Sequence, residues 1–157
     1  MRYFTKELWM NINDCDTGIR AKAEKEWSEN QVIYQQQFAE LKKRLPRRFV
    51  KEYLSRNGLH DYTILGITIN RIKKEYCCEL KLSNRQETVF VTITGIKQLR
   101  IDIDSFRYCI QGKLLWGYSE FELSSDDNMK LAVLCDMQNE IQFEFERISL
   151  STKRRFA

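Results

Sequence analysis

The sequence has very little proline, histidine and glycine, and it has no long apolar run. Of its 157 residues one is proline, one is histidine and six are glycine. No stretch approaches the roughly 20 consecutive apolar residues that a membrane span needs, so we expect neither a span nor a signal peptide. The single histidine, His60, argues against a zinc site of mixed histidine and cysteine ligands. We find no internal repeat and no linker rich in glycine, serine or proline.

Disulfide bonds are also not expected. The five cysteines are an odd number, and their spacing matches no disulfide framework. Cys77 and Cys78 are adjacent, and neighbouring side chains of a strand point to opposite faces, so the pair cannot bind one metal ion together. We therefore expect a reduced, cytoplasmic protein in which the thiols are small buried side chains. The sequence predicts no cofactor, no metal site and no catalytic residue.

Charge is unevenly distributed along the chain. The length fits one domain, residues 1–157, because a chain of this size hides about 70% of its unfolded surface on folding. Residues 1–60 carry 12 basic and 8 acidic side chains, whereas residues 61–157 carry 14 of each. The whole net charge of +4 therefore belongs to the first part, where we expect any electrostatic partner to bind.

Residues 1–58 have helical periodicity and form the predicted helical subdomain. Thr5 is a suitable N-cap for a short helix from about Lys6 to Ile12. Three capping residues precede a long second helix that runs to about Leu45: Asp14, Asp16 and Thr17. Its apolar residues recur at spacings of seven, four, three and four, which predicts one buried seam: Trp27, Tyr34, Phe38, Leu41 and Leu45. Pro46 ends or bends this helix.

A third, short amphipathic helix is predicted after Pro46, and Asn57-Gly58 supplies its left-handed stop. Residues 59–157 form the predicted β-rich subdomain, because the apolar period falls to two. Links too short for parallel crossovers join seven predicted strands: Tyr62–Ile72, Tyr76–Leu82, Thr88–Thr94, Gln98–Ile103, Leu114–Leu123, Met129–Cys135 and Glu140–Leu150. We expect an α+β fold, with amino-terminal helices packed on a curved antiparallel sheet, barrel or small sandwich of about seven strands.

The last predicted strand changes parity. Its apolar residues occupy odd positions from Ile141 to Phe145 and even positions after Arg147, which predicts a bulge or bend near Glu146. The strand around Trp116 has apolar residues on both faces, with Trp116 and Tyr118 expected on the same one.

Two groups of residues are candidate sites. Basic residues cluster around Pro46, and five of them form the candidate partner-binding set: Lys43, Arg44, Arg47, Arg48 and Lys51. Such a cluster binds phosphates or an acidic protein surface, and it is equally typical of the solvated face of an amphipathic helix. The second group is a candidate pocket at Trp116, Tyr118 and Glu120, where aromatic rings beside a carboxylate line either a cleft or the core. If Glu120 is buried, we expect an Arg or Lys of the amino-terminal helices as its partner.

Several short motifs resemble an uncharacterised family of small bacterial cytosolic proteins, catalogued as domain of unknown function 4085. These are Arg2–Trp9, Leu59–Asp61, the Trp116-x-Tyr118-x-Glu120 strand, Leu131–Leu134 and Glu140–Phe143. The resemblance implies a helical part before a β-rich part, and it implies no activity, cofactor or catalytic residue. Gly117 and Ser119 depart from the family, which tends to a larger residue and a second acid there.

The sequence thus favours a non-enzymatic protein-interaction module, of the immunity or adaptor kind, that binds an acidic partner surface through the basic helix. A nucleic-acid binder that uses Arg47, Arg48 and Lys51 is one alternative. A hydrolase or small-ligand carrier with its pocket near Trp116 is another.

Overall fold

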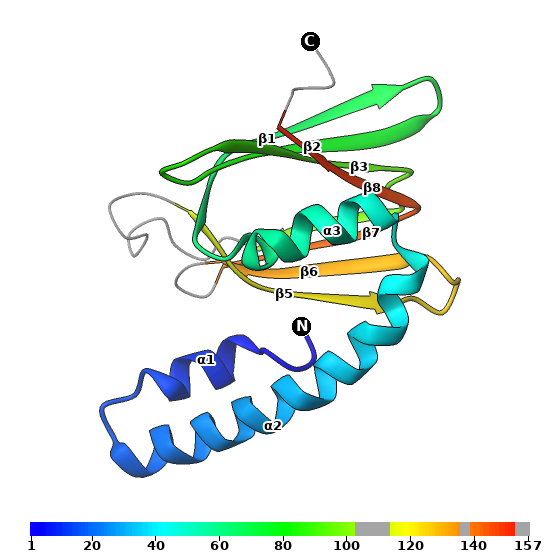
Figure 1. Cartoon of the computed structure of the whole chain (residues 1–157). Helices are drawn as coiled ribbons and strands as arrows, with labels where there is room; N and C mark the ends of the chain where they lie inside the picture. The colour runs from blue at the N-terminus through cyan, green and yellow to red at the C-terminus, as the bar shows by residue number, and fades with distance from the viewer. Residues whose placement is uncertain (103–113, 136–138, 153–157) are drawn as a thin grey trace.

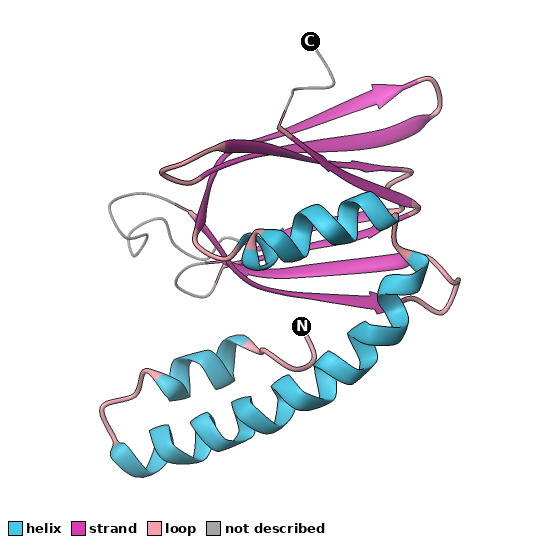
Figure 2. Cartoon of the chain, viewed as in Figure 1, coloured by secondary structure: helices cyan, strands magenta, loops and turns pink. Residues whose placement is uncertain are grey.

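A computed structural model describes residues 1–102, 114–135 and 139–152 of the chain (Figure 1). Five helical elements come first: α1 (Lys6–Ile12), α2 (Thr17–Leu41), the 3-10 turn η1 (Lys42–Arg44), α3 (Arg47–Ser55) and the 3-10 turn η2 (Asn57–Leu59). Eight strands follow: β1 (Tyr62–Ile72), β2 (Glu75–Ser83), β3 (Thr88–Thr94), β4 (Gln98–Asp102), β5 (Leu115–Leu123), β6 (Met129–Cys135), β7 (Glu140–Phe145) and β8 (Arg147–Ser151). The predicted α+β fold is confirmed, with helices packed on an antiparallel sheet (Figure 2).

The residues predicted to begin and end the helices do so in the structure. The Thr5 hydroxyl accepts a hydrogen bond from the Leu8 N–H, and the Asp16 carboxylate caps α2. The α-helical geometry of α2 ends before Leu45, and the last turn tightens into η1. Pro46 explains this ending, because a proline disfavours helical geometry in the residue before it, and Leu45 is extended. After α3, Gly58 adopts the predicted left-handed conformation with φ 66°.

The eight strands form one open sheet in the order β4-β7-β6-β5-β1-β2-β3-β8. Eight strands appear in place of seven because the last predicted strand divides at Glu146. β7 pairs with β6 and β4, whereas β8 pairs with β3 at the other end of the strand order. The predicted bend near Glu146 is therefore confirmed, and it lets one chain segment join the two ends of a sheet that curves around α3 (Figure 1).

The main core lies between α3 and the face of the sheet that is turned toward this helix. α3 contributes the buried rings of Phe49 and Tyr53. The strands contribute mostly aliphatic and phenylalanine side chains, among them Leu80, Val91, Leu131, Phe143, Phe145 and Leu150. Burial of this apolar surface positions α3 within the curve of the sheet.

The prediction that Trp116 and Tyr118 share a face is wrong. Trp116 pairs with Cys135 and Tyr118 pairs with Leu134, so Gly117 is an extra residue that forms a β-bulge. The bulge reverses the parity of β5. Trp116 faces the main core, and Tyr118 lies on the opposite face of the sheet, against Phe4.

β1 pairs with β5 only at Tyr62 and Thr63, so it leaves the rest of this edge of β5 uncovered. α2 passes along the uncovered part of the edge. The Tyr34 hydroxyl accepts a hydrogen bond from the Phe121 backbone N–H at 2.8 Å, which satisfies a donor of this edge. Trp27 packs on Tyr118, while Phe38 packs on Phe121. One helix thus covers both faces of β5 at its edge.

Replacing Gly117 by alanine tests the bulge. A Cβ at Gly117 would lie 2.5 Å from the Leu134 carbonyl oxygen, whereas a Cβ at Gly66 would meet nothing within 4 Å. We expect Gly117→Ala to lower the free energy of unfolding by about 2 kcal/mol, as overpacking does, and Gly66→Ala to change it by less than about 0.5 kcal/mol. Urea denaturation measures both. Equal effects of the two substitutions would contradict the close approach at Gly117.

Candidate functional site

The five predicted cationic residues fall into two groups in the structure. Lys43 forms an ion pair with Glu40, one turn earlier on the same helical segment. The Arg44 guanidinium donates two hydrogen bonds to the Asp127 carboxylate, each 2.6 Å long. This arrangement lowers the pKa of Asp127, because the charged donor stabilises the carboxylate. Lys43 and Arg44 therefore have acidic partners within the chain.

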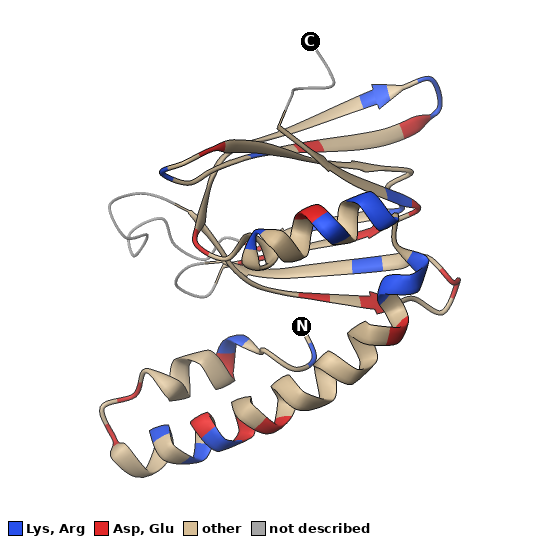
Figure 3. Cartoon of the chain, viewed as in Figure 1, with Lys and Arg blue, Asp and Glu red and all other residues tan. Residues whose placement is uncertain are grey.

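The other three residues, Arg47, Arg48 and Lys51, are exposed on α3 and form what we call the α3 cationic face. Within residues 1–102, 114–135 and 139–152, none of the three has an acidic partner. Arg47 and Lys51 are four residues apart and thus neighbours on the helix surface. Leu54, one turn further on and 51% exposed, continues the same side of α3. Figure 3 shows basic residues along this helix.

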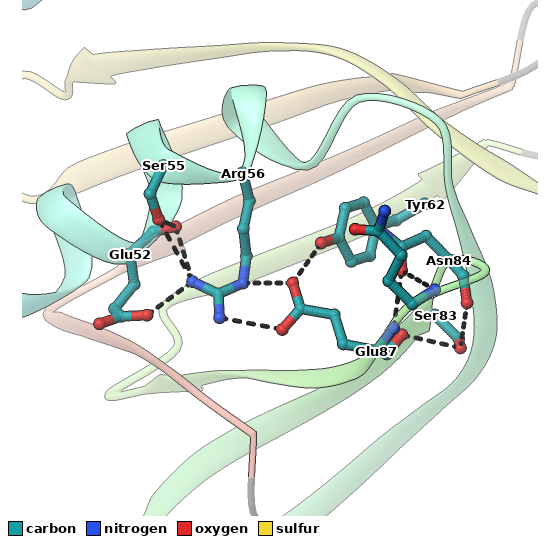
Figure 4. Close-up of polar contacts among 8 residues, drawn as sticks. Glu52, Ser55, Arg56, Tyr62, Ser83, Asn84 and Glu87 are labelled. Atoms are coloured by element: carbon teal, nitrogen blue, oxygen red, sulfur yellow. Dashed lines mark hydrogen bonds and ion pairs between the residues drawn. The ribbon is translucent and has the colours of Figure 1, made fainter.

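An ion-pair network fixes the far end of α3 (Figure 4). The Arg56 guanidinium donates to both oxygens of Glu87 at 2.7 and 3.0 Å, and it also donates to Glu52 at 2.6 Å. The Tyr62 hydroxyl donates to Glu87 at 2.6 Å. The hydrogen bonds from Arg56 and then from Tyr62 lower the pKa of the Glu87 carboxyl, since both stabilise its charge. The network ties α3 to the link between β2 and β3.

The three residues of the predicted pocket do not meet in one cavity. Trp116 is 1% exposed and belongs to the main core. Tyr118 lines a cavity of about 500 Å³ between α1, α2 and β5. Glu120 lines a separate cavity of about 280 Å³, together with Glu122 and Lys130. The bulge at Gly117 accounts for the separation of Trp116 from the other two.

Glu120 is buried, but the expected Arg or Lys partner is wrong. Its carboxylate accepts three backbone N–H hydrogen bonds, from Arg2 at 2.7 Å, Tyr3 at 2.8 Å and Phe4 at 2.6 Å. Peptide donors satisfy a buried carboxylate without a second charge. No pattern in the sequence marked residues 2–4 as donors, because every non-proline residue carries the same backbone N–H.

The described residues offer little else for chemistry. Among them no group of three or more His, Cys, Asp or Glu side chains is placed to hold a metal ion. The four described cysteines are free, and Cys109 lies outside the described residues. None of the described helices combines the length and apolar character that crossing a membrane requires.

Comparison with known proteins adds no relative: no family model matches the chain, and neither does any curated protein. The resemblance to domain of unknown function 4085 stays a prediction.

Replacing Glu87 by glutamine tests the network that holds α3. The pKa of Glu87 is lowered in the folded state, so its stabilising effect is full above the unfolded pKa of about 4.3 and is lost as the pH falls through the folded pKa. At pH 7 we expect Glu87→Gln to cost about 2 kcal/mol of unfolding free energy. Urea denaturation between pH 7 and pH 3 should show this difference shrinking at the acid end.

Glu26→Gln is the matched control, because Glu26 is exposed on α2 and forms no ion pair with any of the described residues. We expect it to change stability by less than about 0.5 kcal/mol. A cost of Glu87→Gln that does not vary with pH would show that the carboxylate charge is not what stabilises this contact.

Proposed function

We propose that this protein is a non-enzymatic interaction module, of the immunity or adaptor kind, that binds an acidic protein surface through the α3 cationic face. Arg44 and Lys43 are neutralised by acidic residues of the same chain, whereas Arg47, Arg48 and Lys51 remain exposed with no such partner in the described parts. Their charge is thus available to another molecule.

The chemistry of the α3 cationic face suits carboxylates on a protein. Arginine presents a planar fork of N–H donors that matches a carboxylate, and two of the three residues are arginine. The exposed Leu54 beside Lys51 adds an apolar contact of the kind found in the centre of protein interfaces. Positive potential on the face also speeds the encounter with an acidic surface.

α3 is also rigidly held. Phe49 and Tyr53 are buried in the main core, and Arg56 joins the end of the helix to Glu87. A partner that binds to a helix held at fixed position loses little free energy in ordering it. The Arg56 network therefore supports binding without touching the partner.

Nucleic acid is the weaker interpretation of the same face. Affinity for a duplex grows with the number of phosphates neutralised, and three cations give only a small footprint. The β-rich part, residues 61–157, carries no net charge to extend it.

A charge-reversal experiment tests the proposal. The probe is a fluorescein-labelled polyglutamate peptide, and its anisotropy is followed during titration with the full chain at about 0.1 M salt. The face variant is Arg47→Glu/Arg48→Glu/Lys51→Glu. The control is Arg20→Glu/Lys22→Glu/Lys25→Glu, which changes the net charge of the chain by the same amount at exposed residues of α2. We expect the face variant to weaken peptide binding at least about 10-fold and the control to weaken it less than about 3-fold, because local charges are screened beyond about 10 Å.

A duplex oligonucleotide of mixed sequence is titrated under the same salt. Tighter binding of the duplex than of the peptide, lost in the face variant alone, would replace the proposal by the nucleic-acid interpretation. Absence of peptide binding, or equal loss in the two triple variants, would also overturn it.

A further inference from the structure

The cavity between α1, α2 and β5 has aromatic walls and an acidic rim. Trp9 of α1, Trp27 of α2 and Tyr118 of β5 line it, and so does Glu24. Its volume is about 500 Å³, which falls within the range of small-molecule sites, and it is open to solvent. All three aromatic side chains are only half-buried, so they are accessible from the cavity.

The rings of Trp27 and Tyr118 form adjoining walls of the cavity. The centroids of Trp27 and Tyr118 are 4.6 Å apart, and the two rings are inclined at 74°. Phe4 packs behind both, 4.8 Å from Trp27 and 5.8 Å from Tyr118. Because the hydrogen bond from the Phe4 N–H to Glu120 holds Phe4 in place, these walls are formed before any ligand binds.

The charged lining of the cavity is acidic, and the exposed Arg20 and Lys25 lie beside Glu24 on α2 without lining it. Glu24 is the charged residue that lines it, and no described Lys or Arg does so. Burial raises the pKa of the Tyr118 hydroxyl, and the negative charge of the nearby Asp61 raises it further. The His60 ring is 4.9 Å from that of Tyr118, and its Nδ1 is 3.0 Å from Asp61. The Glu24 carboxylate therefore offers a partner of opposite charge to a cation in the cavity.

We propose that this cavity binds a methylated ammonium group, held against the rings of Trp9, Trp27 and Tyr118 with Glu24 at the rim. Aromatic rings attract cations through their quadrupole, and tryptophan does so best. A quaternary ammonium has no N–H to satisfy, so it needs ring faces rather than hydrogen-bond acceptors. A primary ammonium loses its water on entry, and the lining offers it in return the Glu24 carboxylate and the side-chain oxygens of Asn13 and Ser28. This site lies apart from the α3 cationic face and does not depend on it.

Choline is the first probe, and 3,3-dimethyl-1-butanol is its neutral isostere, with carbon in place of the charged nitrogen. Titration of the full chain is followed by tryptophan fluorescence, to which Trp9 and Trp27 contribute from the cavity, and by calorimetry. We expect saturable choline binding, and at least about 10-fold weaker binding of the isostere. Equal affinity for the two probes, or no binding of choline, would overturn the proposal.

A second experiment distinguishes whether the methylated ammonium group belongs to a protein or to a small molecule. A peptide with one trimethyl-lysine is compared with the same peptide carrying unmodified lysine. Preference for the trimethylated peptide over choline assigns a protein ligand, and preference for choline assigns a small molecule. Either result supports the site, whereas tighter binding of unmodified lysine contradicts it.

Glu24→Gln tests the rim without disturbing the core, because Glu24 is exposed. We expect it to weaken choline binding about 3- to 5-fold and to leave the isostere unchanged. Glu26→Gln on the same helix is the control, since Glu26 does not line the cavity. Equal effects of the two variants on choline would show that the acidic rim has no specific role.

Discussion

The Glu120 carboxylate, buried on β5, accepts three hydrogen bonds from the backbone of residues 2–4. An ionised carboxylate without partners is very costly to bury, so the segment and the strand hold each other in place. Phe4, fixed by one of these bonds, packs against Trp27 of α2 and Tyr118 of β5. The position of the α1–α2 hairpin on the sheet depends on this contact, and so do the walls of the aromatic cavity.

The bulge at Gly117 decides which side of the sheet Glu120 occupies. Without the extra residue, Tyr118 and Glu120 would share the face of Trp116 and point into the main core. With it, Trp116 completes the core under α3, and Glu120 meets the amino-terminal segment. The two faces of β5 thus support two separate surfaces: the α3 cationic face above the main core, and the aromatic cavity on the opposite side.

Much of the fold is predictable from local signals. The caps at Thr5 and Asp16, the stop at Gly58 and the parity change near Glu146 each depend on residues close in sequence, and each is confirmed. The face of Tyr118 is not predictable this way, because aromatic residues on both sides of Gly117 make the alternation look unbroken.

Long-range partners explain the rest of the difference. Arg44 stands in a run of basic residues, so the sequence predicts a cation without a partner. In the structure the Asp127 carboxylate, 83 residues away, pairs with it. Likewise, nothing local to Arg56 predicts its contact with Glu87 across the β2–β3 link. Of the five cations predicted for a partner site, the folded arrangement therefore leaves Arg47, Arg48 and Lys51 exposed without an acidic partner among the described residues.

Amide hydrogen exchange at Arg2, Tyr3 and Phe4 tests most directly whether Glu120 joins the helical part to the sheet. Backbone amides outside helices and strands exchange quickly unless a hydrogen bond within the protein protects them. We predict slow exchange at all three amides in the native protein, and fast exchange, together with weaker protection of α1, in a Glu120→Leu variant that remains folded, because leucine has no oxygen to accept these hydrogen bonds. Fast exchange of these amides in the native protein, or unchanged protection in the variant, would contradict it.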